Sequence, residues 1–188
     1  MTSPSVRTRK VILDAAREEF AAHGLAGGRV ERIAKAAGAN VQRIYAYYSD
    51  KQGLFDAVVL DAAASLAEAI RTEHRDIDSL ANAIFDFVVN DPANTRTMTW
   101  ARLEREDEFF QLMDTGQSGV GAVSELARLQ DAGLVTTDWD AVTILEALIA
   151  LCEQWHPNTR ENGRSDIDRH RALVLRFVRT LAVEPAAS

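Results

Sequence analysis

A short polar stretch near the N-terminus carries the side chains with the clearest chemistry. Gln42 and Arg43 stand side by side in the sequence. Tyr47 follows four residues after Arg43, and Lys51 four residues after that. An arginine or a glutamine can form two hydrogen bonds to one base edge, to guanine and to adenine respectively. Tyrosine and lysine can bind phosphate oxygens, which fixes register. These residue types at this spacing indicate contact with double-stranded DNA.

Two short helices joined by a tight turn would position these groups. Apolar periodicity predicts helices over Val30–Ala37 and Val41–Tyr47. Gly38 is expected to end the first helix and Asn40 to cap the second, and we include Asn40 among the candidate DNA contacts. This arrangement is typical of a helix-turn-helix unit. Four apolar residues are expected to hold the two helices together: Ile33, Ala34, Ala37 and Ile44.

Charge is distributed unevenly along the chain. Residues 1–52 carry nine Lys and Arg side chains against five Asp and Glu, a net charge of +4. Because the whole chain carries −7, the remaining residues carry −11. A basic head on an acidic body is expected where only one end of a protein meets phosphate. The alternative is chance variation over a surface. We therefore predict a DNA-binding domain over residues 1–52 and a second domain over residues 53–188.

Helical periodicity also dominates the rest of the chain, with no convincing strand pattern. One helix is predicted before the DNA-contacting unit, over Arg7–His23. Three interior glycines predict a break or kink in a long helix over Asp107–Ala132, because each costs about 1 kcal/mol relative to alanine. The chain is therefore expected to be all-α, with about nine helices. The other predicted helices are Asp50–Glu73, Ser79–Asn90, Ala93–Leu103, Thr137–Trp155 and Ser165–Ala182.

Three runs of residues in the N-terminal part form a recognisable pattern: ILDAA from Ile12, VERIAKAAG from Val30 and IYAYYSDK from Ile44. Together they resemble the N-terminal signature of the TetR family of bacterial regulators. The resemblance implies a homodimer whose two recognition helices enter successive major grooves of a palindromic operator, about 34 Å apart. It also implies repression that is relieved by a small-molecule effector held in the C-terminal body. The chain is expected to be cytoplasmic, because no apolar signal core follows its basic N-terminus. Tyr45 matches a position that mainly supports the fold.

Three positions depart from the family pattern, of which Tyr48 in place of a common Phe changes little. Gly28-Arg29 stands where the family usually has Thr or Ser opening the second helix, and Arg29 is expected to supply the phosphate contact instead. A cation at a helix N-terminus is unfavourable without DNA. Gln42-Arg43 stands where the family often has Gly-Thr, which indicates a distinct operator with guanine readout by Arg43.

The body supplies candidates for an effector pocket and for a dimer interface. The pocket candidates are bulky residues that could equally be plain core: Phe85, Met98, Trp100, Phe109, Met113 and Trp155. The last two predicted helices are more apolar than one core face requires, which indicates a four-helix interface between two subunits. Its candidates are Leu145, Leu148, Ile149, Leu173, Phe177 and Leu181.

No residue pattern points to an enzyme. The sequence shows no paired catalytic carboxylates, no glycine-rich phosphate loop and no nucleophile motif. Two loose groups, Glu153 with His156 and Asp166 with Asp168 and His170, resemble parts of metal sites but are more simply surface or interface residues. We expect no cofactor and no metal. No window approaches the roughly 18 apolar residues of a membrane span, and the single cysteine, Cys152, is expected to be buried.

The favoured hypothesis is a ligand-responsive repressor in which an effector shifts the fourth helix and changes the spacing of the two heads. A second hypothesis keeps DNA binding but has a filled core and no ligand. A third is a helical enzyme or binding protein on the same fold. The simplest alternative for residues 30–48 is a helical hairpin that never touches DNA.

Overall fold

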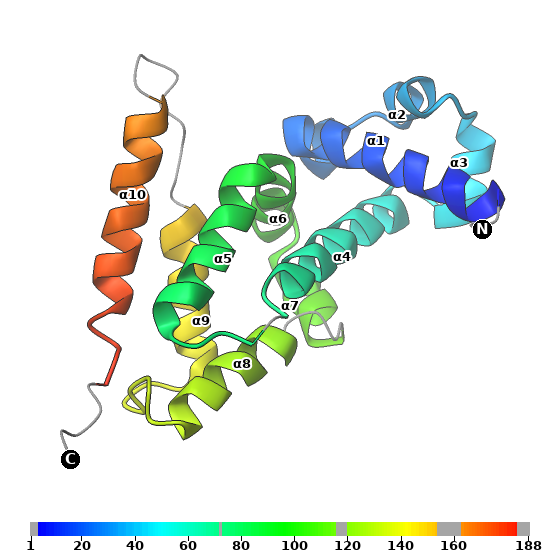
Figure 1. The fold of residues 1–188 in the computed structure, drawn as a ribbon. Coiled ribbons are helices and arrows are strands. Elements are labelled where there is room, and N and C mark those ends of the chain that lie inside the picture. Colours follow the sequence, from blue (N-terminus) through cyan, green and yellow to red (C-terminus); the bar gives the residue numbers. More distant parts are fainter. Residues whose placement is uncertain (1–3, 72, 116–119, 154–162, 184–188) are drawn as a thin grey trace. The chain divides into compact units, whose positions relative to one another are not determined.

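The computed structural model describes residues 4–71, 73–115, 120–153 and 163–183, and these contain ten α-helices (Figure 1). Within those ranges the only β pairing is an isolated antiparallel bridge between Val135 and Ala182. The predicted all-α fold is therefore confirmed. The helices are α1 (Pro4–Gly27), α2 (Val30–Ala37), α3 (Val41–Tyr48), α4 (Lys51–Ala69), α5 (Ile77–Asn90), α6 (Pro92–Glu104), α7 (Glu106–Thr115), α8 (Val120–Asp131), α9 (Ala141–Glu153) and α10 (Gly163–Val178).

The chain divides into two compact units, and the division falls within α4. The first unit comprises residues 1–64 and 91–116, and the second comprises residues 65–90 and 117–188. In the first unit α1 packs against α6 and α2, and α2 packs against α3. In the second unit α9 packs against α5, α8 and α10, and α10 also packs against α5. Helices α6 and α7 therefore belong with the N-terminal helices, although α5 precedes them in the chain.

Helix α1 changes direction at Gly24, one residue after its predicted end. Gly24 has φ +65° and ψ −174°, a backbone conformation that is essentially restricted to glycine. A Cβ at this position would lie 2.7 Å from the Glu104 carboxylate and 2.9 Å from the Trp100 ring. Glycine is thus required both by the backbone and by the close approach of α6. One further turn then runs to Gly27.

The core of the first unit joins α1 to the helix-turn-helix unit and to α4. Phe20 from α1 meets Phe55 from α4 edge to face, with ring centroids 5.0 Å apart. Arg17 ties the same helix to its neighbours through carboxylates of Asp61 and Asp91, at 3.0 and 3.7 Å. These contacts place α1 as the central helix of the first unit.

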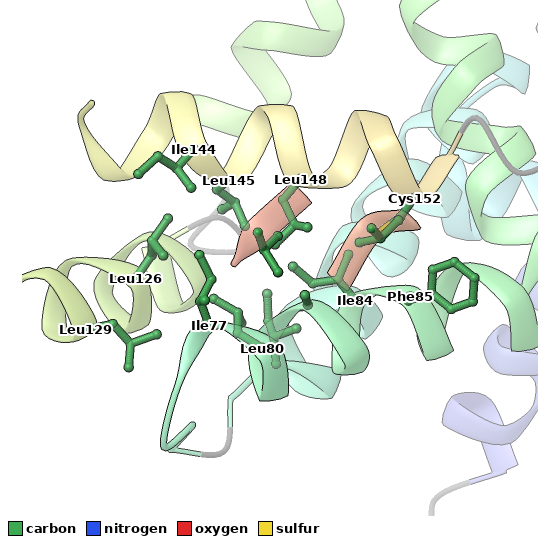
Figure 2. Close-up of a cluster of buried hydrophobic side chains, with 14 of the residues drawn as sticks. Ile77, Leu80, Ile84, Phe85, Leu126, Leu129, Ile144, Leu145, Leu148 and Cys152 are labelled. Carbon is green, nitrogen blue, oxygen red and sulfur yellow. The ribbon is translucent and has the colours of Figure 1, made fainter. Parts of the chain in front are cut away.

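The core of the second unit is almost wholly aliphatic. Figure 2 shows side chains from α5, α8 and α9 pointing toward one another, among them Leu80, Leu126 and Leu148. Helix α10 adds Val174 and Val178 to this core, and both are buried. The unit therefore rests on non-directional apolar burial, the dominant favourable term in folding.

Two predicted helices differ from the structure in ways that matter for surface residues. Helix α9 begins at Ala141 rather than Thr137, because the Asp140 carboxylate accepts a hydrogen bond from the backbone N–H of Thr143 at 3.0 Å. Trp139, which falls inside the predicted helix Thr137–Trp155, precedes α9 in the structure and is 60% exposed. The predicted helix Asp107–Ala132 is divided into α7 and α8, and residues 116–119 lie outside the described ranges.

Candidate nucleic-acid interface

The two short helices are stable without DNA because their ends and inner faces are satisfied. Gly38 ends α2 in the left-handed conformation, with φ +60°. Asn40 caps α3: its side-chain oxygen accepts a hydrogen bond from the backbone N–H of Arg43 at 2.7 Å. The predicted capping role of Asn40 is confirmed. The inner face of the pair is buried through Ile33, Ala34 and Ile44.

Helix α3 turns a polar face toward solvent. At 100° per residue, Ala46 lies opposite the buried pair Ile44 and Tyr48. Gln42 and Arg43 flank Ala46 on either side, and both are exposed. A small residue at the centre lets the helix approach a groove floor closely, while the longer flanking side chains can reach base edges.

Two tyrosines lie at the margins of this face. Tyr45 is 40% exposed, and Tyr47 on the other margin is half-buried. The expectation that Tyr45 mainly supports the fold is therefore wrong. Its position, one residue after buried Ile44 and three after Gln42, could have indicated from the sequence that its side chain is exposed. Tyr48 fills the structural role instead, because it is buried and its hydroxyl donates to the carbonyl of Arg9. Burial raises the pKa of Tyr48 above its ordinary value, so the hydroxyl remains a donor.

The start of α2 is capped from a distance rather than by Arg29. The backbone N–H of Arg29 donates to the carboxylate of Glu19 at 2.8 Å, and Arg32 Nε donates to the same carboxylate at 2.8 Å. Partial burial raises the pKa of Glu19, but the hydrogen bonds from Arg32 and Arg29 outweigh it, and the pKa lies below its ordinary value. Glu19 thus supplies the negative charge that this helix end favours, and the Arg29 side chain stays exposed.

Lys51 is partly engaged within the protein. Its ammonium donates to the carbonyl oxygen of Ala26 at 3.3 Å, and the residue is half-buried. Asp50 caps α4 by accepting a hydrogen bond from the backbone N–H of Gly53 at 2.7 Å. Lys51 therefore links the end of α1 to the start of α4.

Helix α6 holds the end of α1 through two side chains. Trp100 Nε1 donates to the carbonyl of Ala21 at 3.3 Å. The Glu104 carboxylate accepts from the backbone N–H of Leu25 at 2.6 Å and from that of Ala26 at 3.3 Å. Glu104 is half-buried and satisfies backbone donors near the turn before α2.

The candidate pocket residues do not form one group. Phe85 is buried in the core of the second unit, with the Arg171 guanidinium 4.5 Å above its ring. Trp155 lies outside the described residues. The other four pack with the core of the first unit: Met98, Trp100, Phe109 and Met113. Each described candidate therefore contributes to a packed core.

The candidate dimer residues separate into buried and exposed sets. Leu145 and Leu148 are buried in the protomer's own core, so they offer little surface to a partner. Ile149 and Leu181 are half-buried. Leu173 and Phe177 are 55% and 41% exposed and border an open apolar depression along α10. The exposed apolar set also includes Trp139 and Val142.

The remaining titratable candidates have structural surroundings. His170 Nε2 lies 2.8 Å from the carbonyl oxygen of Leu151, Asp166 pairs with Arg169, and His156 falls outside the described ranges. Among the described residues no three His, Cys, Asp or Glu side chains are arranged to hold a metal ion. Burial raises the pKa of Cys152 to about 12, so its thiol is protonated at neutral pH.

None of the helices in the described ranges combines the length and apolar character that a bilayer crossing needs.

Comparison with known proteins agrees with this geometry. Residues 12–58 match the model of the bacterial regulatory proteins of the tetR family, and residues 76–180 match a tetracyclin repressor-like C-terminal domain. The chain is 32% identical over 145 residues to the HTH-type transcriptional repressor SCO4008 of Streptomyces coelicolor, covering 77% of this chain and 76% of that protein. It is 30% identical over 135 residues to the repressor AcnR of Corynebacterium efficiens, covering 71% of each.

Solved structures give the same result. A putative transcriptional regulator of Streptomyces coelicolor, SCO4942, superposes with a TM-score of 0.75 at 30% identity, covering 95% of this chain and 99% of that one. A tetR-family regulatory protein from Rhodococcus RHA1, with a TM-score of 0.69, 22% identity and coverage of 97% and 100%, shares the fold. The helix-turn-helix unit, the all-α body and the matches to both family models establish that this chain is not an enzyme but belongs to the TetR family of bacterial helix-turn-helix transcriptional regulators.

Proposed function

We propose that this chain is a cytoplasmic repressor that binds a palindromic operator as a homodimer and leaves it when a small-molecule effector binds. The observation that carries the proposal is the solvent-facing side of α3, where Ala46 lies between Gln42 and Arg43 on a capped and internally packed scaffold. The names of two relatives, SCO4008 and AcnR, describe both as HTH-type transcriptional repressors.

The side chains around α3 divide into base-reading and phosphate-binding groups. Arg43 is proposed to pair with a guanine edge and Gln42 with an adenine edge in the major groove. Tyr45 and Tyr47, on opposite margins of the helix, are placed to meet the two backbones that border the groove. Exposed Asn40 lies at the entry of the helix.

Two further cations support docking at the edges of this face. Arg29 is exposed at the start of α2, and Glu19 already compensates that helix end, so the Arg29 side chain is available for a phosphate. Lys51 can exchange its contact with the carbonyl of Ala26 for a phosphate oxygen at modest cost, because that contact is exposed and long.

Helix α4 is proposed to transmit the effector's influence. It is covalently continuous from the edge of the DNA-binding domain, residues 1–52, into the second domain, residues 53–188, and it crosses the division between the two units. Within the first unit it is held by ion pairs of Asp56 with Arg105 and of Asp61 with Arg17. A shift of α4 would therefore move the head and change the spacing of the two recognition helices from about 34 Å.

The proposed dimer surface is the exposed apolar side of α9 and α10. It is centred on Leu173 and Phe177, with Val142 and the preceding Trp139 also exposed. Exposed apolar side chains gathered on one surface are typical of subunit interfaces. Leu145 and Leu148 would act behind this surface as core, while half-buried Ile149 and Leu181 can contribute at its edge.

The nature of the effector separates two versions of the proposal. The packing of Phe85 and of Met98, Trp100, Phe109 and Met113 into two cores favours a regulator without a small-molecule ligand. In the ligand-responsive version, one of these cores must open to admit the effector. The pocket would then exist in a minor conformation of the protein, which the bound effector stabilises. A screen of metabolites for release of a fluorescent operator, with thermal stabilisation of the released protein, distinguishes the two versions.

Binding to DNA upstream of the protein's own gene tests the function itself. Fluorescence anisotropy and footprinting are expected to show a symmetric protected site, with affinity that falls steeply as salt rises. The same affinity for that fragment and for random DNA, at equal salt, would contradict a sequence-specific operator.

A further inference from the structure

The first turns of α1 form a basic surface that the family match does not include. Arg7, Arg9 and Lys10 all lie before residue 12, where the match to the tetR-family model begins. All three are exposed, and no acidic residue lies in the first turn of α1. Lys10 is partly neutralised by Asp14, at 3.3 Å. A cation in the first turn of a helix, as Arg7 is in α1, is unfavourable for the fold alone.

Arg9 connects this surface to the recognition helix. Its guanidinium lies 5.3 Å from the centroid of the Tyr48 ring, and its carbonyl oxygen accepts the Tyr48 hydroxyl hydrogen bond at 3.0 Å. Tyr48 is the last residue of α3 and is buried. Figure 1 shows the N-terminal end of α1 next to α3. The position of Arg9 is therefore fixed relative to Gln42 and Arg43 by two contacts to one side chain.

We propose that Arg9, supported by Arg7, is a second DNA contact that binds a backbone phosphate beside the C-terminal end of α3. This inference rests on the proposed operator binding and adds a site to it. A guanidinium presents a fork of N–H donors to phosphate oxygens. The Tyr48 ring face covers one side of the Arg9 guanidinium and limits its rotation, which lowers the entropy lost on binding. Arg9 therefore sets docking position and strength, while sequence is read by α3.

The salt dependence of operator binding tests this role. Each phosphate contact contributes about 0.9 to the slope of log affinity against log salt, and a dimer makes each contact twice. Arg9→Gln, which keeps much of the side-chain length but removes the charge, is expected to reduce the slope by about 1.8 and to weaken operator and random DNA by the same factor. Arg9→Lys, which keeps the charge, is expected to retain the slope. Arg75→Gln is the matched control, because Arg75 is an exposed arginine of the second unit.

Ethylation interference locates the contact directly. With the wild-type protein, ethylation of one phosphate per half-site beside α3 is expected to block binding. With Arg9→Gln, binding is expected to become insensitive to ethylation of that phosphate, while the guanine contacts of α3 persist. A purely structural role for Arg9 would weaken binding of Arg9→Gln while leaving the salt slope and every interference position unchanged, and that result overturns the inference. Failure of the wild-type protein to bind any operator would instead contradict the proposed function.

Discussion

Helices α3 and α10 both turn side chains toward solvent, but the chemistry of those side chains is opposite. The exposed face of α3 carries Gln42 and Arg43 around a single small alanine. The exposed face of α10 carries Leu173 and Phe177. A polar face built on a rigid, capped scaffold suits a charged and hydrated partner such as DNA. An apolar face gains from removal from water and suits a second protein surface.

The two units that carry these helices are held together in the same way, by an apolar core together with polar contacts between residues far apart in sequence. In the first unit the Glu104 carboxylate accepts from the backbone of Leu25, and Arg17 pairs with Asp61. In the second unit Arg171 pairs with Asp86, and Arg179 pairs with Asp78. The difference between α3 and α10 therefore lies in the chemistry of their exposed faces.

The largest expected effect separates two glycines of the first unit. Gly24→Ala is expected to lower the free energy of unfolding by about 3 kcal/mol or more, because the backbone strain and the overpacking against Glu104 and Trp100 add. Gly38 has a similar φ, but no other side chain lies within 4 Å of the place a Cβ would take, so Gly38→Ala is expected to cost only about 1 kcal/mol. Urea unfolding followed by circular dichroism measures both. Equal losses would show that neither the backbone conformation of Gly24 nor its contact with α6 adds to the cost.

A charge on the exposed face of α10 should separate the dimer without unfolding the chain. The double variant Leu173→Glu/Phe177→Glu is expected to sediment as a monomer and to lose about 100-fold or more in operator affinity, because the two heads no longer bind as one unit. Leu103→Glu is the matched control, since Leu103 is 74% exposed on α6. A double variant that remains a dimer would move the interface away from α10.

A smaller effect concerns acid stability at the start of α2. The pKa of Glu19 lies below its ordinary value, so its ionised form adds stability above the ordinary glutamate pKa, and this stability is lost as the pH falls through the lower, folded-state pKa. Glu19→Gln is expected to lower stability at pH 7 by about 1 kcal/mol, a typical value for a lost helix cap. The difference from wild type should shrink toward pH 3. Thermal unfolding across this range provides the measurement, and a pH-independent difference would contradict the role of the charge.

The sequence predicted the helix-turn-helix region better than the rest of the chain for a physical reason. In the helix-turn-helix region, glycine, asparagine and charged side chains have few alternative roles, so Gly38, Asn40 and the exposed pair Gln42 and Arg43 lie where the sequence placed them. Tyr45 was misjudged because an aromatic side chain is as common in a core as on a binding surface.

Apolar residues in the second unit are ambiguous in sequence. Leu173 and Val174 are neighbouring apolar residues of α10, yet the structure buries Val174 and exposes Leu173. Two neighbouring positions at the edge of an apolar helical stripe differ in burial because different side chains pack against them. Those side chains belong to helices distant in sequence, so the local pattern does not reveal them. The pocket candidates were ambiguous for the same reason, since pocket walls and core walls share a composition.

The central claim is that the exposed face of α3 reads the operator, and base-by-base specificity tests it most directly. Wild type and Arg43→Ala are compared on operators carrying each symmetric base-pair change, at one fixed salt concentration. Wild type is expected to lose about 1–3 kcal/mol at one guanine pair per half-site, and Arg43→Ala is expected to be insensitive at that position alone. An Arg43→Ala protein that discriminates at every position as wild type does would contradict the account.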